Sequence, residues 1–389
     1  MTLVYLIAGE QSGDVLGARL IAALRAARPD LEFAGIGGPR MAELGFQTLF
    51  PMQELAVMGL LEVLPRIRRL RRLMQDAVAD IRSRRPDVLV TIDSPGFTLR
   101  VLKQIEGIRK VHYVAPQVWA WRPKRVREFP GLWDRLLCLL PFEPAWFAAH
   151  GVDGVFVGHP VLESGADRGS GARFRATHAI SPEAAVLILM PGSRRSEVAR
   201  LLPVFGATLE LLSARVPGLV PVVPVASAVA DTVRRATAGW RIRPVIVTDI
   251  ADKHDAYAAA SAALTKSGTS TLELALAGVP MAVTYRVNPL TAAIVRRMIR
   301  IAHVAMVNLL AGRSLVPELL QQDCTPGRLA DTVASLLGDT TAAAAQRDGF
   351  RSVIASLQAP QGLPSAAAAR EILAALDEPP GAGGPVTGG

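Results

Sequence analysis

The chain opens with Leu3-Val-Tyr-Leu-Ile-Ala-Gly-Glu-Gln-Ser-Gly-Asp14, an apolar run that enters a glycine-containing turn. Residues 13–27 follow with apolar side chains spaced by three and four positions, the pattern of an amphipathic helix. A short apolar strand followed by a helix is the repeating unit of a parallel sheet with crossover helices. The opening therefore predicts an α/β fold.

The same unit recurs in two series, which predicts two Rossmann-like, doubly wound domains. The expected strands are 3–8, 31–36, 87–93, 110–116, 134–141 and 155–157, then 186–191, 220–225, 244–249, 262–266 and 279–285. Glycine and serine dilute the apolar pattern across 162–182, so we expect domains at 1–165 and 183–340. Helices are expected over 341–376, with their return to the first domain left open, and residues 379–389 are expected to be disordered. Two such domains place their ligand crevices at the carboxyl ends of the strands, facing a central cleft.

The net charge of +9 comes mainly from arginine and favours an anionic partner: nucleic acid, nucleotide phosphates or an acidic membrane. Cys138 and Cys324 stand far apart without a Cys/His cluster, which argues against disulfides and zinc and fits a reducing compartment. The longest uncharged stretch, 216–230, is shorter than the roughly 20 residues that span a bilayer. No secretion signal is recognisable at the start. We therefore expect a cytoplasmic protein whose membrane contact is peripheral.

The turn after the first expected strand carries Glu10, Ser12, Gly13 and Asp14. Glycine permits close backbone approach, and a helix N-terminus offers N–H groups. The two carboxylates argue against direct phosphate contact, so a functional interpretation is a site for acceptor hydroxyls. The alternative is a tight turn with Ser12 as the helix N-cap. Spacing alone leaves both open.

Asp93 ends the apolar run Val88-Leu-Val-Thr-Ile and precedes Ser94-Pro95. A carboxylate at the carboxyl end of a buried strand lies at the crevice, where it can accept a proton from an attacking hydroxyl. The alternative is ordinary turn chemistry that caps the next helix. We favour the catalytic interpretation.

Trp119, Trp121 and Arg122 follow the fourth expected strand in a chain with five tryptophans. Aromatic faces beside an arginine suit a sugar ring or a lipid chain. A core aromatic pair is the alternative.

In the second domain, an expected strand runs into Pro191-Gly-Ser193-Arg194 at a helix start. Backbone N–H groups and a guanidinium together would neutralise a diphosphate. A later turn has the same arrangement, a glycine with small hydroxyl residues at the N-terminus of a helix. Glu273 lies one helical turn further on, within reach of ribose hydroxyls. The small residues of that turn are Ser267, Gly268, Thr269 and Ser270. Two such sites indicate a nucleotide diphosphate, against the alternative of a hydroxyl-capped helix.

The chain contains no Asp-x-Asp motif, and no histidines cluster with metal-ligand spacing. We therefore expect neither a metal nor another cofactor.

Residues 57–74 combine apolar residues with five arginines. A basic amphipathic helix of this kind is typical of a membrane-surface element that binds an anionic inner-membrane surface. The alternative is a crossover helix that packs its leucines on the sheet. The candidate membrane residues are Leu60, Leu64, Ile67, Leu70 and Leu73.

Taken together, the motifs resemble those of the lipid-A-disaccharide synthases, which are inverting glycosyltransferases of the GT-B fold. The matching segments span residues 9 to 321. They are 9–14, 93–97, 116–122, 156–160, 191–194, 266–273, 308–312 and 316–321. Two positions depart from the family pattern, with Thr98 where asparagine is usual and Val161 where leucine is usual.

The resemblance implies transfer from UDP-2,3-diacylglucosamine to 2,3-diacylglucosamine 1-phosphate (lipid X), with release of UDP. It assigns Asp93 as general base, Arg194 to the diphosphate and Glu273 to the ribose, and adds Asn308, Glu318 and Gln321 as further substrate-binding residues. The expected mechanism is a single displacement by the acceptor 6-hydroxyl. Arg194 and backbone N–H groups near Ser193 and 267–269 are expected to stabilise the negative charge that develops on the leaving diphosphate. A homodimer is compatible with this assignment.

Two rival interpretations remain. One is another GT-B enzyme that uses UDP-N-acetylglucosamine, either a 2-epimerase or an N-acetylglucosaminyltransferase. The other is a basic protein without catalytic activity that binds nucleic acid or a membrane. The sequence carries no nucleic-acid motif, so we expect no nucleic-acid partner.

Overall fold

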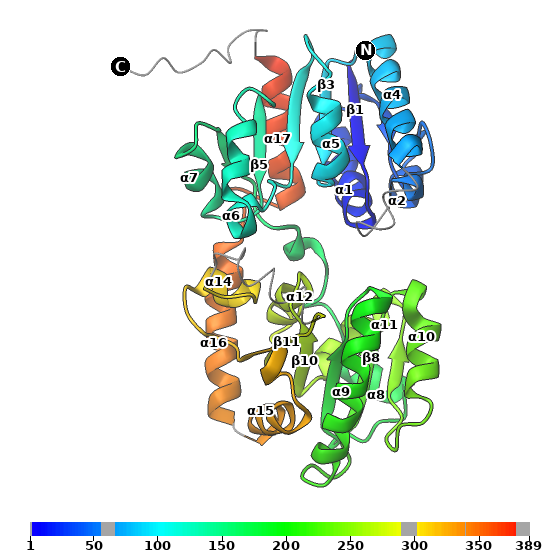
Figure 1. Cartoon of the computed structure of the whole chain (residues 1–389), viewed down its shortest axis with the longest axis vertical. Coiled ribbons are helices and arrows are strands. Elements are labelled where there is room, and N and C mark those ends of the chain that lie inside the picture. Colours follow the sequence, from blue (N-terminus) through cyan, green and yellow to red (C-terminus); the bar gives the residue numbers. More distant parts are fainter. Residues whose placement is uncertain (1, 56–66, 289–301, 339, 379–389) are drawn as a thin grey trace. The chain divides into compact units, whose positions relative to one another are not determined.

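The computed structural model describes residues 2–55, 67–288, 302–338 and 340–378 (Figure 1). The chain forms two compact units. The first combines Met1–Pro160 with Leu357–Gly389, and the second comprises Val161–Ser356. Within the described residues, no helix has the length and apolar character that crossing a membrane requires.

The first unit contains a six-stranded parallel sheet in the order β2-β1-β3-β4-β5-β6. The first series of predicted strands is confirmed. These strands are β1 (Leu3–Ala8), β2 (Glu32–Ile36), β3 (Val88–Ile92), β4 (Arg109–Tyr113), β5 (Arg135–Cys138) and β6 (Gly154–Phe156). Successive side chains of a strand point to opposite faces, so the apolar runs supply two cores at once.

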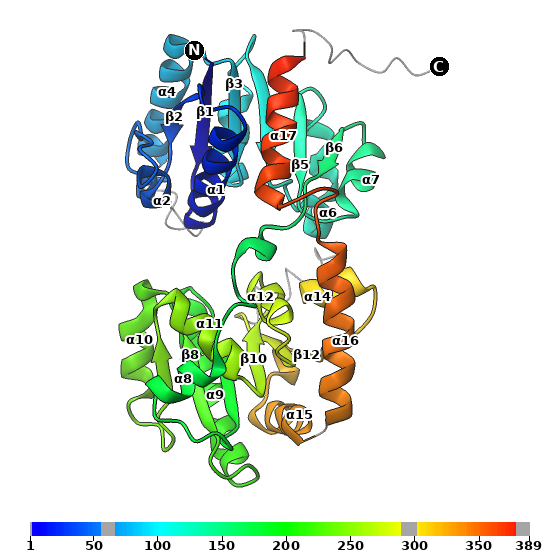
Figure 2. The same ribbon diagram turned by 180° about the vertical axis from the view of Figure 1, so that it is seen from behind.

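Helices cover both faces of this sheet. Val4, Leu6 and Ala8 of β1 pack in one core with α1 (Gln11–Ala27) and α17 (Pro364–Asp377), which lie side by side (Figure 2). Tyr5 and Ile7 pack in the opposite core. That core includes residues of α4 (Ile67–Arg84), α5 (Pro95–Leu102) and α7 (Glu143–Ala148).

The final helix is thus part of the first unit. Its apolar face, with Ala368 and Ile372, is buried against α1 and the sheet. Ion pairs join it to the first unit, between Arg28 and Asp377 and between Arg135 and Glu371.

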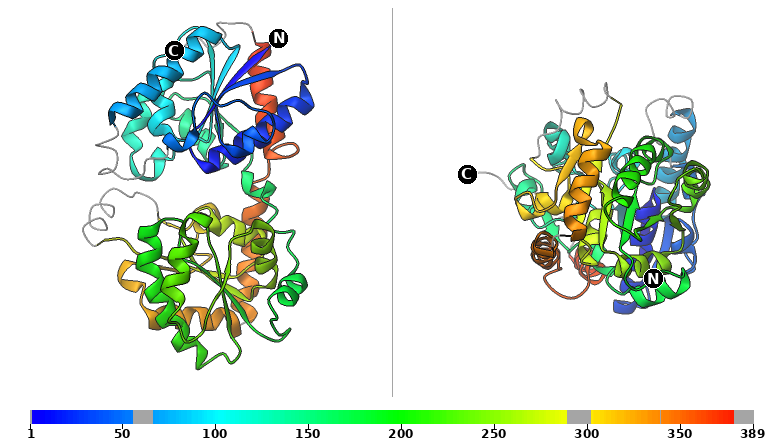
Figure 3. Two further views of the ribbon diagram at one scale, coloured as in Figure 1. Left: turned by 90° about the vertical axis from the view of Figure 1, so that its right-hand side faces the viewer. Right: turned by 90° about the horizontal axis from the view of Figure 1, so that it is seen from below.

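The second unit contains a second sheet, which Figure 3 shows flanked by helices. Its strands are parallel, in the order β12-β11-β10-β7-β8-β9. All five predicted strands are present, as β7 (Val186–Met190), β8 (Val220–Pro224), β9 (Val245–Val247), β10 (Ala262–Lys266) and β11 (Met281–Tyr285). The sequence analysis missed β12 (Glu318–Leu320), a three-residue edge strand paired with β11. The described helices of this unit are α8 (Gly171–Thr177), α9 (Arg195–Ser213), α10 (Ser227–Thr237), α11 (Ile250–Ala259), α12 (Ser270–Leu276), α14 (Met306–Ala311), α15 (Pro326–Gly338) and α16 (Thr340–Ser356). The prediction of two doubly wound α/β domains is therefore confirmed.

The segment 162–182, interpreted from its composition as the boundary, lies within the second unit. Its helix α8 packs against α11, and Arg173 of α8 bonds Asp255 of α11. A Cβ atom on Gly169 would lie 1.9 Å from the His254 carbonyl oxygen. The glycine here therefore allows close packing of the backbone, which composition alone does not distinguish from a linker.

Candidate functional site

Each sheet has one point where the strand order reverses, and the predicted catalytic residues follow the strands at these points. In the first sheet, β1 and β3 are neighbours although β2 lies between them in sequence, and Asp93 directly follows β3. In the second sheet, β7 neighbours β10, and Arg194 comes shortly after β7. Ligands of open α/β sheets bind at the carboxyl ends of such strand pairs. The topology therefore supports a candidate site on each unit.

Asp93 occupies an unusual backbone conformation. Its φ angle is 50° and that of Ser94 is 48°, so two successive residues other than glycine are left-handed. The Asp93 N–H donates to the Tyr113 carbonyl oxygen at 2.9 Å. Burial raises the pKa of the Asp93 carboxyl above its ordinary value, while a hydrogen bond from the Ser94 backbone opposes the rise. Ser94 is the N-cap of α5 and Pro95 opens the helix, as the capping alternative expects, but the Ser94 side chain makes no capping bond.

The turn after β1 is largely structural. The buried Asp14 carboxylate accepts N–H groups of Gly38, Arg40 and Met41 at 2.9–3.1 Å, and so caps the short helix α2 (Pro39–Ala42). These three bonds argue against the predicted substrate contact of Asp14.

The remaining predicted residues of that turn divide by exposure. Gly13 is buried, where a Cβ atom would stand 3.4 Å from that of Ala8. Ser12 is exposed, and the N-cap of α1 is Glu10 rather than Ser12. Only Glu10 and Ser12 therefore remain candidates for substrate contact in this turn.

The two tryptophans after β4 have different roles. Trp119, in the short helix α6 (Val118–Trp121), is buried, and its Nε1–H donates to Glu143 at 3.1 Å. Burial raises the pKa of Glu143 to about 7. Trp121 is 43% exposed, and the Arg122 guanidinium carbon lies 4.3 Å from its ring centroid. The core interpretation therefore holds for Trp119, while Trp121 and Arg122 present a cationic aromatic surface.

In the second unit, Arg194 and Lys266 flank a buried carboxylate, that of Glu197. Lys266, the last residue of β10, places Nζ 3.0 Å from Glu197 Oε1, and Arg194 lies 3.7 Å from the same oxygen. The Ser193 N–H, predicted to meet a diphosphate, instead donates to Glu197 Oε2 at 3.2 Å, and the Arg194 N–H does so at 3.4 Å. Side-chain cations, rather than these N–H groups, are the groups suited to an anion here.

Glu273, in α12, lies beside two further polar groups. Lys253 Nζ is 3.0 Å from Glu273 Oε2, and the Tyr257 hydroxyl donates to the same oxygen at 3.3 Å. The Glu273 side chain is 26% exposed, so part of it remains accessible.

The small residues before Glu273 are mostly engaged within the protein. The Ser267 hydroxyl donates to Val304, and that of Ser270 lies 3.3 Å from Thr265 Oγ1. Thr269 is the N-cap of α12, and Gly268 has a φ of 158° beside the Lys266 side chain. These residues shape the turn that presents Lys266 and Glu273.

Asn308, Glu318 and Gln321 form internal contacts. The Asn308 side chain is fully buried, donates to Val316 and Glu318, and accepts the Leu315 N–H, each at 2.8 Å. These bonds argue against direct substrate contact by Asn308. Glu318 accepts the Val304 and Ala305 N–H groups at 3.0 Å, and Gln321 accepts the Val287 N–H at 3.4 Å.

The predicted membrane segment is described only in part. Leu60, Leu64 and the side chain of Ile67 lie outside the described residues. Leu73 is buried, so its assignment to a membrane surface was wrong, and Leu70 is half-buried. The α4 helix packs its apolar residues on the sheet while the arginines at 68, 69, 71 and 72 are exposed.

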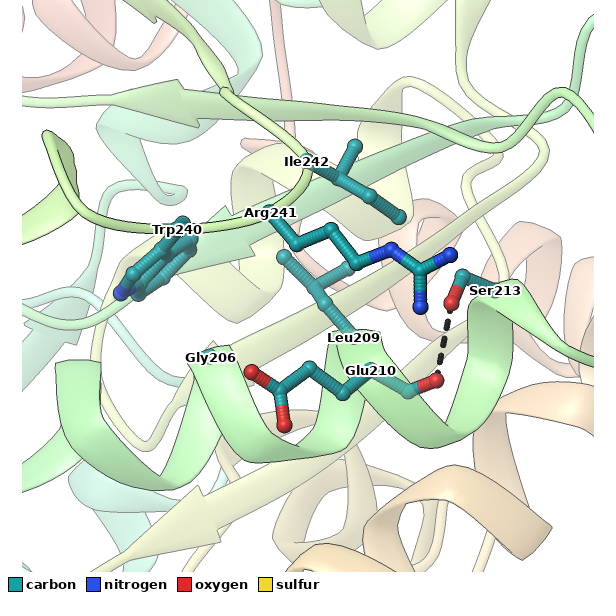
Figure 4. Close-up of a pocket in the computed structure, with 7 residues that line it drawn as sticks. All are labelled: Gly206, Leu209, Glu210, Ser213, Trp240, Arg241 and Ile242. Atoms are coloured by element: carbon teal, nitrogen blue, oxygen red, sulfur yellow. Dashed lines mark hydrogen bonds between the residues drawn. The ribbon is translucent and has the colours of Figure 1, made fainter.

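A shallow hollow on the second unit is separate from these residues (Figure 4). It lies beside the C-terminal half of α9 and contains none of the predicted site residues. Its lining comprises Gly206, Leu209, Glu210, Ser213, Trp240, Arg241 and Ile242. Over the described part of the chain, no three or more His, Cys, Asp or Glu side chains gather in a way that could hold a metal ion.

Sequence reasoning missed Glu197, Lys253, Tyr257 and the role of Lys266. A signal existed for two of them: Lys266 ends an expected strand, and Glu197 stands at the third position of a helix, typical of a capping box. Lys253 and Tyr257 come from α11, and only the packing brings them to Glu273.

Comparison with known proteins gives one consistent family. Residues 4–372 match the family model described as lipid-A-disaccharide synthetase. The chain is 62% identical to the lipid-A-disaccharide synthase of Granulibacter bethesdensis over 389 residues, covering 97% of this chain and 99% of the relative. The enzyme of the same name from Pseudomonas aeruginosa is 45% identical, covering 86% of this chain and 89% of its own.

Solved structures share the fold at low sequence identity. A UDP-GlcNAc 2-epimerase from Neisseria meningitidis bound to UDP-GlcNAc matches with a TM-score of 0.65 and 11% identity, covering 97% of this chain and 99% of that one. A calicheamicin glycosyltransferase matches with a TM-score of 0.59 and 16% identity, covering 97% and 98%. These likenesses confirm the predicted GT-B fold.

Proposed function

The chain belongs to the lipid-A-disaccharide synthetase family and is a glycosyltransferase of lipid A biosynthesis, and we propose that it joins UDP-2,3-diacylglucosamine to lipid X. The observation that supports these substrates is the kind of group found where the strand order of each sheet reverses. A carboxyl with a raised pKa follows β3 in one sheet, and two cations flank the end of β7 and β10 in the other. A proton acceptor and an anion site are what a transfer with a diphosphate leaving group needs.

In this proposal Asp93 accepts the proton of the acceptor 6-hydroxyl. The resulting oxygen nucleophile attacks the anomeric carbon of the donor, the bond from that carbon to the diphosphate breaks, and UDP leaves from the opposite face. Such a single displacement inverts the anomeric configuration. Burial supports the role of Asp93, because a carboxyl with a raised pKa binds a proton more strongly than an exposed one.

We assign the leaving diphosphate to Arg194 and Lys266. Both are basic side chains, and both lie beside the Glu197 carboxylate. The Arg194 side chain is 56% exposed, so it can turn toward an anion. Glu273, held by Lys253 and Tyr257, is suited to accept hydrogen bonds from ribose hydroxyls.

The acceptor surface is assigned to Trp121 and Arg122, which follow β4, together with Glu10 and Ser12 in the turn after β1. An exposed indole beside a guanidinium suits a sugar ring that carries a phosphate.

The test of the proposed function is product analysis. Mass spectrometry of a reaction with acylated UDP-glucosamine and lipid X should detect a disaccharide 1-phosphate in equal amount to the UDP released, and NMR should give a β-linkage. UDP release without disaccharide, or epimerisation of UDP-N-acetylglucosamine by the same preparation, would instead support the rival GT-B activities.

We further propose that the protein works at the inner face of the cytoplasmic membrane. The exposed arginines of α4, at 68, 71 and 72, would contact anionic headgroups, each contributing about 1 kcal/mol. Replacing these three by Gln should reduce co-sedimentation with phosphatidylglycerol vesicles. The matched control replaces the exposed Arg235, Arg241 and Arg243 of the second unit by Gln and should bind as wild type. Equal vesicle binding by both triple variants contradicts this placement.

A further inference from the structure

The turn that carries Asp93 is held in a conformation that its own residues do not favour. Left-handed backbone is rare for residues other than glycine, and Asp93 and Ser94 adopt it in succession, with φ angles of 50° and 48°. Such a conformation persists only where surrounding contacts determine it. The contacts that hold this turn therefore also determine where the Asp93 side chain points.

One of these contacts is made by the side chain of Thr98. Its Oγ1 hydroxyl lies 2.8 Å from the Asp93 carbonyl oxygen and 3.0 Å from that of Ser94, and the residue is fully buried. A threonine within a helix ordinarily bonds the carbonyl four residues earlier, which here is Ser94. The shorter contact reaches Asp93, five residues earlier and outside α5, so it ties the helix to the turn.

Two further contacts fix the same turn, one made by the backbone and one made by close packing. The Asp93 N–H donates to Tyr113 at 2.9 Å. A Cβ atom on Gly9 would lie 2.6 Å from the Ser94 hydroxyl oxygen, so glycine there lets the turn lie against the end of β1. Among these contacts, only that of Thr98 can be removed by a side-chain change that leaves the backbone groups and the packed volume in place.

We propose that Thr98 is a positioning residue for the transfer reaction, in which its hydroxyl holds the Asp93 carbonyl and thereby fixes where the Asp93 carboxylate points. The inference rests on the proposed role of Asp93 as general base. Without the hydroxyl, the Asp93–Ser94 turn exchanges among other backbone conformations, and the carboxylate is correctly placed for only part of the time. Turnover therefore falls, while donor binding in the second unit is unaffected.

The test compares Thr98→Val, which removes the hydroxyl at nearly constant volume, with Thr98→Ser, which restores it. Misplacement of a catalytic group by about 1 Å costs about a hundredfold in rate, so kcat of Thr98→Val should fall by about tenfold to a hundredfold. KM for the UDP-sugar should stay within about twofold. Thr98→Ser should retain most of kcat, and the acid limb of the kcat–pH profile should move in Thr98→Val but not in Thr98→Ser.

The matched control is Thr208→Val in α9. Thr208 is also buried, and its hydroxyl donates to the Val204 carbonyl at 2.8 Å, in a helix interior of the second unit. It should lose comparable thermal stability while keeping wild-type kcat and pH profile.

Wild-type kcat and pH profile in folded Thr98→Val overturn the inference, as does an equal loss of kcat in Thr208→Val. If Thr98→Val does not fold, Thr98→Ser and Thr98→Ala decide, since they differ by the hydroxyl alone and equal kcat values overturn the inference. An inactive Asp93→Ala beside a fully active Thr98→Val refutes only the role of Thr98. An active Asp93→Ala refutes the proposed base itself.

Discussion

The ammonium group of Lys266 lies 3.0 Å from the carboxylate of Glu197, which in turn accepts the Ser193 N–H at 3.2 Å. Lys266 ends β10, and Ser193 lies in the turn that follows β7. One carboxylate thus joins the two strands that meet where the order of the second sheet reverses. A Cβ atom on Gly192 would lie 2.3 Å from the same carboxylate, so glycine is needed for this close contact.

We expect Lys266→Gln to weaken UDP binding by about tenfold or more, because a hydrogen bond to a charged group contributes about 1.5–3 kcal/mol. The variant also removes the nearer of the two cations beside the buried Glu197 carboxylate, which should lower the melting temperature. Calorimetry with UDP measures the affinity. The control is Arg215→Gln at the other end of α9, where Arg215 pairs with Asp331. Unchanged UDP affinity in folded Lys266→Gln would remove Lys266 from the anion site.

Arg194→Ala should weaken UDP binding and also slow transfer. Its guanidinium is assigned both to the bound diphosphate and to the charge that develops as UDP leaves, so kcat and affinity fall together. Steady-state kinetics and calorimetry on the same preparation separate the two effects. Wild-type kcat and wild-type UDP affinity in this variant would exclude Arg194 from the diphosphate site.

Asp93→Ala should keep the fold and UDP affinity and lose turnover by about a hundredfold or more, as expected for a general base. In the wild type, burial raises the pKa of Asp93, and a base works only when ionised. The kcat value should therefore fall as pH decreases, at a higher pH than an ordinary aspartate would give. A folded Asp93→Ala variant with near-wild-type turnover excludes this role.

Transfer should persist in excess EDTA. The chain contains no Asp-x-Asp motif to bind a divalent ion, and Arg194 and Lys266 supply positive charge for the diphosphate. The assay compares initial rates with and without EDTA. Complete loss that is restored by Mg²⁺ or Mn²⁺ would contradict a metal-independent reaction.

The first unit should lose stability in mild acid. Burial lowers the pKa of His112 from 6.5 to about 3, so below about pH 6.5 the unfolded chain binds the proton first. The free energy of unfolding then falls with pH by up to about 1.4 kcal/mol per pH unit for this group. His159, with a pKa lowered to about 4, adds to the slope, whereas Glu143, with a pKa raised to about 7, opposes it.

Urea unfolding at pH 7, 6 and 5 measures that slope. His112→Gln cannot take up the proton, so it should be less stable at pH 7 yet show a shallower decline in acid. A slope equal to that of the wild type would exclude His112 as a cause.

The sequence predicts the sheets well because its information there is local. The run from Val88 to Ile92 is apolar except for Thr91, which is expected of a strand buried on both faces, and it places Asp93 at the carboxyl edge. Strand β12 was not predicted because three residues are too few to show an alternation of apolar and polar side chains. Its extended conformation depends on its pairing with β11.

The predicted site residues divide in the same way, into those whose position follows from the local sequence and those whose role depends on tertiary contacts. Asp93 and Arg194 owe their positions to the strands they follow. The side chains of Asp14 and Asn308 have the polar chemistry of a binding site, yet each bonds a backbone group of another segment, the Gly38 N–H and the Val316 carbonyl. No local pattern distinguishes a carboxylate or amide that meets a ligand from one that satisfies a buried turn.

The return of α17 to the first unit affects how the protein is made. The chain leaves that unit at Pro160 and re-enters it at Leu357, so the second unit is contiguous in sequence and the first is not. A ribosome thus completes the whole of the second unit before it releases the helix that covers α1. Until then, the α1 side of the first sheet lacks the apolar surface of Ala368, Ile372 and Ala375, and in the nascent chain the unit begun first is finished last.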